Sequence, residues 1–475
     1  MDPKLSPPQN DRAGNHPPLA GPHPPPCRRP SGRPPNPTLD LAQSAQTLIQ
    51  VLRSCFPHLN RWFNELPDPR RQDRCRYEAA HLWWQILATY LFRAGSRNAL
   101  DEQRNTEHLP LNLGELCGQK AEDPRFGGQP TITCSDNAAR QARRVDPAEV
   151  AKIPLEMLRT LWERRLFDHA RLFDHWYVVL VDGTVQEKCR EGFEEDGKTT
   201  TGRARYRYVL QALMLGPEGL AFPFMHEAMD VHNPQTEKED CELQAFLRLS
   251  QRLKEAFPRL PICWVGDALY SCQATVECCQ RYGWKYIWTL KEGRQPATWE
   301  ELIALLPHSR DQRLSTRLGP GGQTGRLDYC WAEHLMLGPQ TTQAILAGEI
   351  TAHSATLYAF MTNFANLTPE RVLEITRVGR ERHRIEDTFN TEKNHGIGLE
   401  HVFCAEPNAA KNYYTLLQVA LILWICACHG GLKRLFNWAR KATEQGLAKA
   451  IWDGLRMHRL PPDVKPMGQI RFGFT

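Results

Sequence analysis

Three acidic residues, far apart in the 475-residue chain, have the chemistry of a divalent-cation site. Asp182 closes the apolar run WYVVLVDG, and Asp267 closes a second apolar run, LPICWVGD. Glu386 lies in RERHRIEDTFNTEKNHG, residues 380–396, where cations crowd around one glutamate. Carboxylate oxygens are preferred ligands of the hard cations Mg²⁺ and Mn²⁺. These residue types predict a site for two such ions if the fold brings the three side chains together.

Two Mg²⁺ or Mn²⁺ ions about 4 Å apart activate an attacking water and stabilise the leaving oxygen of an in-line displacement at phosphorus. The protein then has mainly to position the reactants and to supply charge. The sequence therefore predicts metal-dependent phosphoryl transfer.

The cations near Glu386 follow a helical spacing. Arg382, Glu386, Phe389 and Lys393 are four, three and four residues apart, so they share one helix face. An ion-paired surface helix has the same pattern and is the alternative interpretation. Four arginines with one intervening glutamate lie within eight residues, more positive charge than ion pairing uses up: Arg377, Arg380, Arg382 and Arg384. We predict that these arginines and Lys393 bind DNA phosphates.

The elements after residue 170 must position these side chains. Two continuous apolar runs, the first rich in valine, predict buried strands ending at Asp182 and Asp267, at the sheet edge where sites of α/β proteins are built. Two more strands and a helix opened by Asn233 lie between them, and the order of strands and helices is that of a mixed α/β sheet. A helix opened by Thr368 precedes the long helix around Glu386. A turn or cap residue is the alternative for each aspartate.

Composition and periodicity divide the rest of the chain. Residues 1–37 hold 13 of the 35 prolines and several basic residues, which is typical of a disordered tail. Residues 38–170 show helical spacing, with a helix start at Asp146, and the run ARQARR at 139–144 is a DNA-contacting or a solvated helix face. After a helix capped at Thr298, residues up to 356 are turn-rich and strand-like.

We therefore predict six segments: a Pro-rich basic tail (1–37), a helical DNA-binding domain (38–170), the first part of the catalytic core (171–297), a β-rich insertion (298–356), the second part of the core (357–430), and a C-terminal helical segment and tail (431–475).

Overall composition excludes several classes of protein. A net charge of +5 permits nucleic acid as a partner without demanding it. Fifteen scattered cysteines without C-x-x-C spacing predict reduced thiols rather than a disulfide framework or a zinc site. The apolar run at 419–428 is about half the roughly 20 residues of a membrane span and predicts a buried helix. With no apolar leader, we expect a cytoplasmic protein.

Three motifs resemble those of the DDE insertion-sequence transposases: VDGT at 181–184, VGDALY at 265–270, and RHRIEDTFNTEKNHG. The spacing of Arg382, Glu386 and Lys393 is that of the subgroup whose third motif is written Y-R-E-K. Gly379 stands where that subgroup has its tyrosine. FNELPDPRR and SDNAARQARRVDP are similar to the leading helical domain of related transposases, so the resemblance covers roughly residues 60–430.

The resemblance implies a ribonuclease H-like α/β core, interrupted by the β-rich insertion and preceded by an all-helical N-terminal domain. It implies a transposase that cleaves phosphodiester bonds at transposon ends and joins the freed 3′-OH to target DNA. Asp182, Asp267 and Glu386 would ligate two Mg²⁺ or Mn²⁺ ions, while Arg382 and Lys393 would contact DNA near the cleaved phosphate. The partners implied are double-stranded DNA with terminal inverted repeats and a second copy of the chain, in a bacterial cytoplasm at the nucleoid.

Two other functions are compatible with the same motifs. One is a nuclease with this core and no strand transfer, and the other is a domesticated DNA-binding protein. Trp299 and Trp331 have two interpretations as well: some relatives stack a flipped base at the insertion, but burial in the insertion's own core is the interpretation that we favour.

Overall fold

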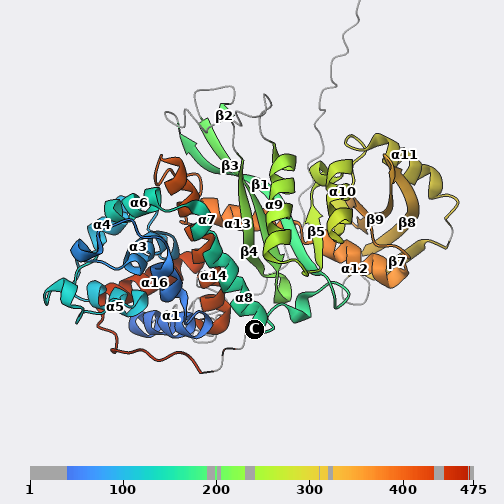
Figure 1. Cartoon of the computed structure of the whole chain (residues 1–475). Coiled ribbons are helices and arrows are strands. Elements are labelled where there is room, and N and C mark those ends of the chain that lie inside the picture. The colour runs from blue at the N-terminus through green and yellow to red at the C-terminus, as the bar shows by residue number, and fades with distance from the viewer. Residues whose placement is uncertain are drawn as a thin grey trace, which may run out of the picture. The chain divides into compact units, whose positions relative to one another are not determined.

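Within the described residues, ten strands form one mixed sheet (Figure 1). The structure, a computed structural model, describes residues 40–189, 198–199, 205–229, 241–309, 311–318, 325–432, 443–468 and 470. Along the sheet the order is β2-β3-β1-β5-β6-β10-β9-β8-β7, and β4 pairs with β3. The strands are β1 (Tyr177–Cys189), β2 (Lys198–Thr199), β3 (Arg205–Leu215), β4 (Ala221–Met229), β5 (Ile262–Gly266), β6 (Lys285–Thr289), β7 (Arg313–Leu318), β8 (Gly325–Leu337), β9 (Gln340–Thr351) and β10 (Ala355–Thr362).

The centre of the sheet joins an antiparallel part to a parallel part. β1, β3 and β4 pair antiparallel, and β5 and β6 continue the sheet parallel to β1. Helices join the parallel strands, because parallel neighbours need a crossover connection. They are α9 (Glu242–Ala256) before β5 and α10 (Gln273–Tyr282) between β5 and β6. The mixed α/β sheet expected from the sequence is therefore present.

Helices cover both faces of this centre. Val178 and Leu180 pack in a cluster with Ile385, whereas Val179 and Val181 pack in the cluster that holds residues of α9. Alternate residues of a strand point to opposite faces, which explains the division. α12 (Pro369–Arg380) and α13 (His383–Asn394) thus lie on the face to which Leu180 points.

The N-terminal part of the described chain is helical as expected, and two C-terminal helices join it. The N-terminal helices are α1 (Leu41–Cys55), α2 (Leu59–Glu65), α3 (Ala79–Leu91), α4 (Arg97–Gln103), α5 (Leu109–Cys117), α6 (Ser135–Arg144), α7 (Pro147–Val150) and α8 (Lys152–Glu163). α14 (Pro407–Ala427) and α16 (Glu444–Met457), red in Figure 1, lie among them, with α14 against α3 and α6 and α16 against α1.

α14 is the buried helix that the apolar run at 419–428 predicts. Continued by a π-helical turn to Leu432, it is long and apolar enough to cross a membrane by length and composition. Protein buries 94% of its most apolar stretch, however, as expected for a core helix. Because α14 also packs against β4, one helix links the helical part to the sheet.

Several local expectations need correction. β1 does not end at Asp182 but runs to Cys189, because its pairing with β3 continues to Cys189. Thr298 does not cap a helix: α11 (Pro296–Leu305) begins earlier, and the Thr298 hydroxyl lies inside it and donates to the Met336 carbonyl at 2.9 Å. The predicted helix start at Asn233 lies outside the described residues. Asp146, in contrast, caps α7 as predicted, accepting a hydrogen bond from the Ala148 N–H.

The strands of the predicted insertion continue the central sheet. β10 pairs with β6 on one side and with β9 on the other, so β7, β8 and β9 extend the same hydrogen-bonded sheet. The described residues all belong to one compact unit, Leu39–Thr475. The segment boundaries predicted within it remain predictions, and the Pro-rich tail at 1–37 lies outside the described residues.

Candidate active site

Asp182 on β1 and Asp267, just after β5, occupy equivalent positions along two neighbouring strands. The parallel pairing of β1 with β5 ends at Leu180 opposite Val265, and each aspartate follows two residues later. Asp267 is the first residue after β5, and its Oδ1 accepts the Leu269 N–H at 2.7 Å, so it is also a cap residue. Asp182 Oδ1 accepts the Gly183 N–H at 2.9 Å. The register thus places the two carboxylates side by side, as the sequence leads one to expect.

Glu386 comes from α13, which covers the same face of the sheet. The segment around Glu386 is not one continuous helix: α12 ends at Arg380, and α13 begins at His383 with Arg382 in the N-cap position. Ile385 and Phe389 are buried against the sheet and fix the orientation of α13. With these two residues buried, the Glu386 carboxylate lies at the surface, with 53% of its side chain exposed.

One cavity of about 610 Å³ is lined by all three acids. Its wall also contains Lys291, from the turn after β6, together with Arg380 and Arg382. β10 contributes Leu357, Tyr358, Ala359 and Phe360. Residues separated by more than 200 positions in the chain therefore converge on one hollow that combines acidic, basic and aromatic side chains.

Arg382 lies between the acids. Its Nη2 is 2.5 Å from Glu386 Oε1, and its Nη1 is 3.8 Å from Asp182 Oδ2. Among the residues that the structure describes, no group of three His, Cys, Asp or Glu side chains is arranged to hold a metal ion. The Glu386 carboxylate instead faces the Arg382 guanidinium.

Asp182 is a partly buried acid with other acids near it. Burial is the main cause that raises the pKa of Asp182 to about 7, and the negative charges of Glu242 and Asp267 add to it. Negative charges that are partly buried near one another favour a bound cation, because a cation removes their repulsion. The three oxygen ligands suit Mg²⁺ or Mn²⁺. In this structure, however, Glu386 pairs with Arg382.

Glu242 is an acid near this site that the sequence analysis missed. It is the first residue of α9, on the opposite face of the sheet, and its carboxylate accepts a hydrogen bond from the Tyr270 hydroxyl. A Cβ on Gly183 would lie 2.6 Å from Glu242 Oε2. The glycine after Asp182 therefore admits the carboxylate, and this glycine is the one sequence signal that points to it.

The predicted phosphate-binding cations are already ion-paired. Acids within two helical turns take two of the arginines: Arg377 pairs with Glu374 at 2.5 Å, and Arg384 pairs with Glu381 at 3.0 Å. Acids from elsewhere in the chain take two more cations. Arg380 pairs with Glu349 of β9 at 3.0 Å, and Lys393 pairs with Glu400 at 2.9 Å.

The expectation that ion pairing does not use up these cations is therefore wrong for the described chain. Counting acids within eight residues missed Glu349 and Glu400, which only the tertiary structure brings near.

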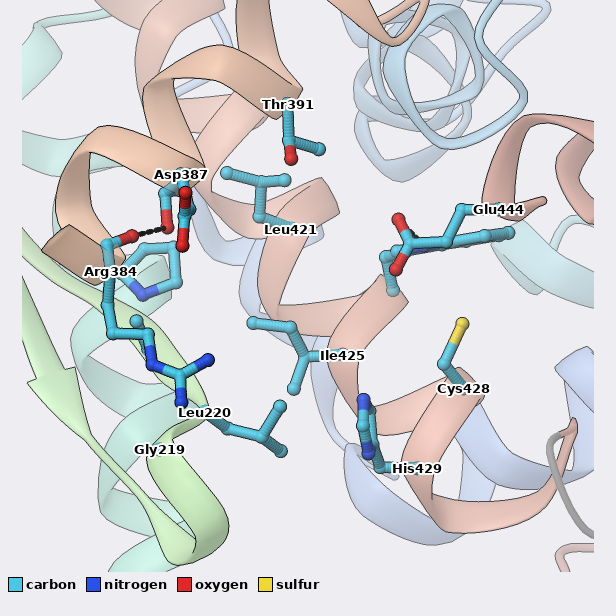
Figure 2. Close-up of a pocket in the computed structure, with 14 residues that line it drawn as sticks. Gly219, Leu220, Arg384, Asp387, Thr391, Leu421, Ile425, Cys428, His429 and Glu444 are labelled. Carbon is cyan, nitrogen blue, oxygen red and sulfur yellow. Dashed lines mark hydrogen bonds between the residues drawn. The ribbon is translucent and has the colours of Figure 1, made fainter. Parts of the chain in front are cut away.

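Three of these five cations line cavities, and they do not all line the same one. Arg380 and Arg382 line the cavity with the three acids, whereas Arg384 lines a second cavity of about 270 Å³. Figure 2 shows Arg384 and Asp387 of α13 at one wall of this second cavity and Glu444 across from them, with Leu421 and Ile425 of α14 between. Arg384 is thus not placed to act on a ligand that Glu386 binds.

Phe360 and Trp331 bear on two further expectations, the glycine at 379 and the role of the tryptophans. A Cβ on Gly379 would lie 2.6 Å from the ring of Phe360, so Phe360 fills the space that a larger residue at 379 would need. Gly379 and Phe360 both line the acidic cavity. Trp331 is 2% exposed, which favours the interpretation that it belongs to the core of the insertion.

Comparisons with known proteins give little to set beside this geometry. No family model matches the chain, and no curated protein matches it. Solved structures that resemble it include piggyBac transposase in a synaptic complex with hairpin DNA, determined by cryo-EM. That alignment covers 89% of this chain and 81% of the other, with 8% identity and a TM-score of 0.37. A likeness of that degree does not indicate a function.

Proposed function

We propose that the protein is a DNA transposase with a ribonuclease H-like core and a DDE site. One observation carries the proposal: a single cavity collects Asp182, Asp267 and Glu386 from three separate segments, together with two arginines and Lys291. The resemblance of the three motifs to insertion-sequence transposases supplies the reaction. The three antiparallel strands followed by two parallel ones support the ribonuclease H-like assignment.

Each side chain of the cavity has a role in this reaction. Asp182, Asp267 and Glu386 would hold two Mg²⁺ or Mn²⁺ ions, which would supply an activated water and stabilise the leaving oxygen. Arg382 exchanges the carboxylate of Glu386 for a DNA phosphate, because both are anions that a guanidinium binds with paired hydrogen bonds. Arg380 and Lys291 hold the backbone on either side.

The test is cleavage of DNA that carries the inverted repeats flanking the coding region. We expect the purified full-length chain to cut this DNA with Mg²⁺ or Mn²⁺. Asp182→Asn, Asp267→Asn and Glu386→Gln each remove one charge at nearly constant volume. We expect each to lower the cleavage rate on the order of a hundredfold to a thousandfold, while affinity for the same DNA stays within about threefold.

Asp387→Asn is the matched control. Asp387 is next to Glu386 on α13 but lines the second cavity, so its variant should cut at the wild-type rate. Equal losses in Glu386→Gln and Asp387→Asn would rule out the proposed site. A substrate with a pre-cut 3′-OH separates the alternatives: joining to target DNA supports a transposase, and cutting without joining leaves a nuclease.

The resemblance also underlies the proposed assembly. We infer a homodimer acting on paired ends in the bacterial cytoplasm, at the nucleoid. Sedimentation of the protein alone and with end DNA would show whether the chain pairs on DNA.

A further inference from the structure

A chain of buried polar side chains runs from the sheet to α13. The Tyr414 hydroxyl donates to Gln211 Oε1 at 2.5 Å, and Gln211 Nε2 donates to Gln418 Oε1. Gln418 Nε2 then donates to Glu392 Oε1 at 3.3 Å. All four residues are buried, and Glu392 is fully inaccessible to solvent. The donors point in one direction along the chain, so Glu392 is its final acceptor.

Stability alone does not explain a glutamate at this position. Burial is the largest cause that raises the pKa of Glu392 to about 8, so its carboxyl group is neutral at pH 7. Its Oε2 has no hydrogen-bond partner among the described residues. An apolar residue of similar volume would avoid the cost of burying these polar groups. A buried polar residue that is retained at such a cost specifies geometry in several known systems.

Two residues of this chain connect it to the proposed site: Gln211 lies on β3, the strand next to β1, and Glu392 lies on α13 with Glu386. Gln211 on β3 is the register partner of Asp182 on β1, and side chains directly opposite each other lie on the same face of a sheet. Glu392 follows Glu386 by six residues on α13. Gln418 of α14 connects the two.

We propose that Glu392 is a positioning residue, which holds α13 against β3 so that Glu386 lies opposite Asp182. The apolar contacts of Ile385 and Phe389 press α13 onto the sheet but are non-directional, so they do not set its position along its axis. A hydrogen bond is directional, so it can set the position of α13 along the helix axis. The catalytic consequence rests on the proposed function, because a misplacement of about 1 Å costs a reaction about a hundredfold.

Amide hydrogen exchange of residues 383–394 tests the positioning without any activity assay. Glu392→Gln keeps the acceptor oxygen and the neutral state, so we expect exchange as in the wild type. Glu392→Leu removes the acceptor, and we expect exchange in this segment to be faster by about tenfold. Gln418→Leu breaks the same chain from α14 and should have the same effect, which covers the case in which Glu392→Leu does not fold.

Asn412→Ala is the matched control for a buried hydrogen bond of α14. Asn412 Nδ2 donates to the Ala142 and Val145 carbonyls at 2.8 Å, at the end of α6. Its loss should speed exchange near α6 and leave residues 383–394 unchanged. The proposal is overturned if Glu392→Leu and Gln418→Leu exchange like the wild type in this segment, or if Glu392→Gln behaves like Glu392→Leu.

End-DNA cleavage then measures the consequence for catalysis. At saturating DNA we expect Glu392→Leu to cut about 10- to 100-fold more slowly, with unchanged DNA affinity, and Glu392→Gln to restore the rate. A slow rate in Asn412→Ala as well would show a merely structural role. If the wild type cuts no DNA, the proposed function fails, while the exchange data still decide whether Glu392 positions α13.

Discussion

At the scale of single residues, neighbours decide what a charge can do. Arg377, Arg380 and Arg382 look equivalent in the sequence, but only the last two line the acidic cavity. Arg377 is paired with Glu374 on the same helix. Arg380 instead reaches Glu349 and lies 4.7 Å from the ring centre of Tyr358. Both arginines are therefore ion-paired, and Arg380 differs from Arg377 in lining the acidic cavity, which makes it the candidate phosphate ligand of the two.

This difference predicts unequal effects of the arginines on DNA binding. A cation that contacts a phosphate displaces counterions, so removing it lowers the dependence of log affinity on log salt by about one unit. We expect that decrease for Arg380→Ala and for Arg382→Ala. Arg377→Ala is the control and should leave the slope unchanged. Binding isotherms at several salt concentrations measure it, and equal slopes for Arg380→Ala and Arg377→Ala would contradict the assignment.

At the scale of elements, the pairing register of β1 and the orientation of α13 determine where the three acids lie. The β1–β5 pairing makes Asp182 and Asp267 level, and buried contacts orient α13. Buried polar groups add directional contacts, which we propose fix the position of α13 along its helix axis. Glu392 is the clearest case, because its carboxyl group is buried between α13, α14 and β3.

Burial of Glu392 predicts a pH dependence of stability. The unfolded chain releases this proton near the ordinary pKa of 4.5, whereas burial raises the pKa to about 8 in the folded protein, with Lys393 opposing the shift. Between these values the folded state keeps a proton that the unfolded state has lost. The stabilisation is therefore fully present below pH 4.5 and is lost as the pH rises to about 8.

The measurement compares the wild type with Glu392→Gln. We expect the free energy of unfolding of the wild type to fall relative to that of the variant between pH 5 and 8, by up to about 1.4 kcal/mol per pH unit. Guanidinium titrations at pH 5.5, 6.5 and 7.5 give this difference. A constant difference would mean that Glu392 is already ionised in the folded protein.

At the scale of the whole described unit, the C-terminal helices complete the N-terminal ones. α14 joins α3 and α6 to β4, and α16 packs on α1. Asn112 links α5 to the C-terminal end of α16 and the residues that follow it. Its Nδ2 donates to the carbonyls of Leu455 and His458 at 2.7 Å, and its Oδ1 accepts the Leu460 N–H at 3.1 Å. Residues more than 340 positions apart thus depend on each other for their hydrogen bonds.

These contacts predict one cooperative unfolding transition for the helical part and the sheet. Asn112→Ala leaves two buried backbone groups and one partly buried group without this partner, so we expect a loss of about 3 kcal/mol of stability in a single calorimetric transition. Asn394→Ala is the control, because Asn394 bonds only the neighbouring Asn390 at the surface and should cost less than about 0.5 kcal/mol. Two separate transitions would contradict the single unit.

Much of the architecture could be predicted because its causes are local. Apolar runs, helical spacing and the cap at Asp146 depend on neighbours in the chain, so they identified the strand that contains Asp182, the strand before Asp267 and the buried helix at 419–428, but not the end of β1 at Cys189. The type and spacing of the three acids indicated metal-dependent chemistry for the same reason.

The tertiary structure decided what depends on distant residues. The level placement of Asp182 and Asp267 follows from the strand register. The pairing of Arg380 and Lys393 follows from acids on other elements, and the approach of Glu242 follows from the missing side chain of Gly183. Hydrogen bonds and charges act through space between residues that are far apart in the chain, so no local pattern of the sequence shows these partners.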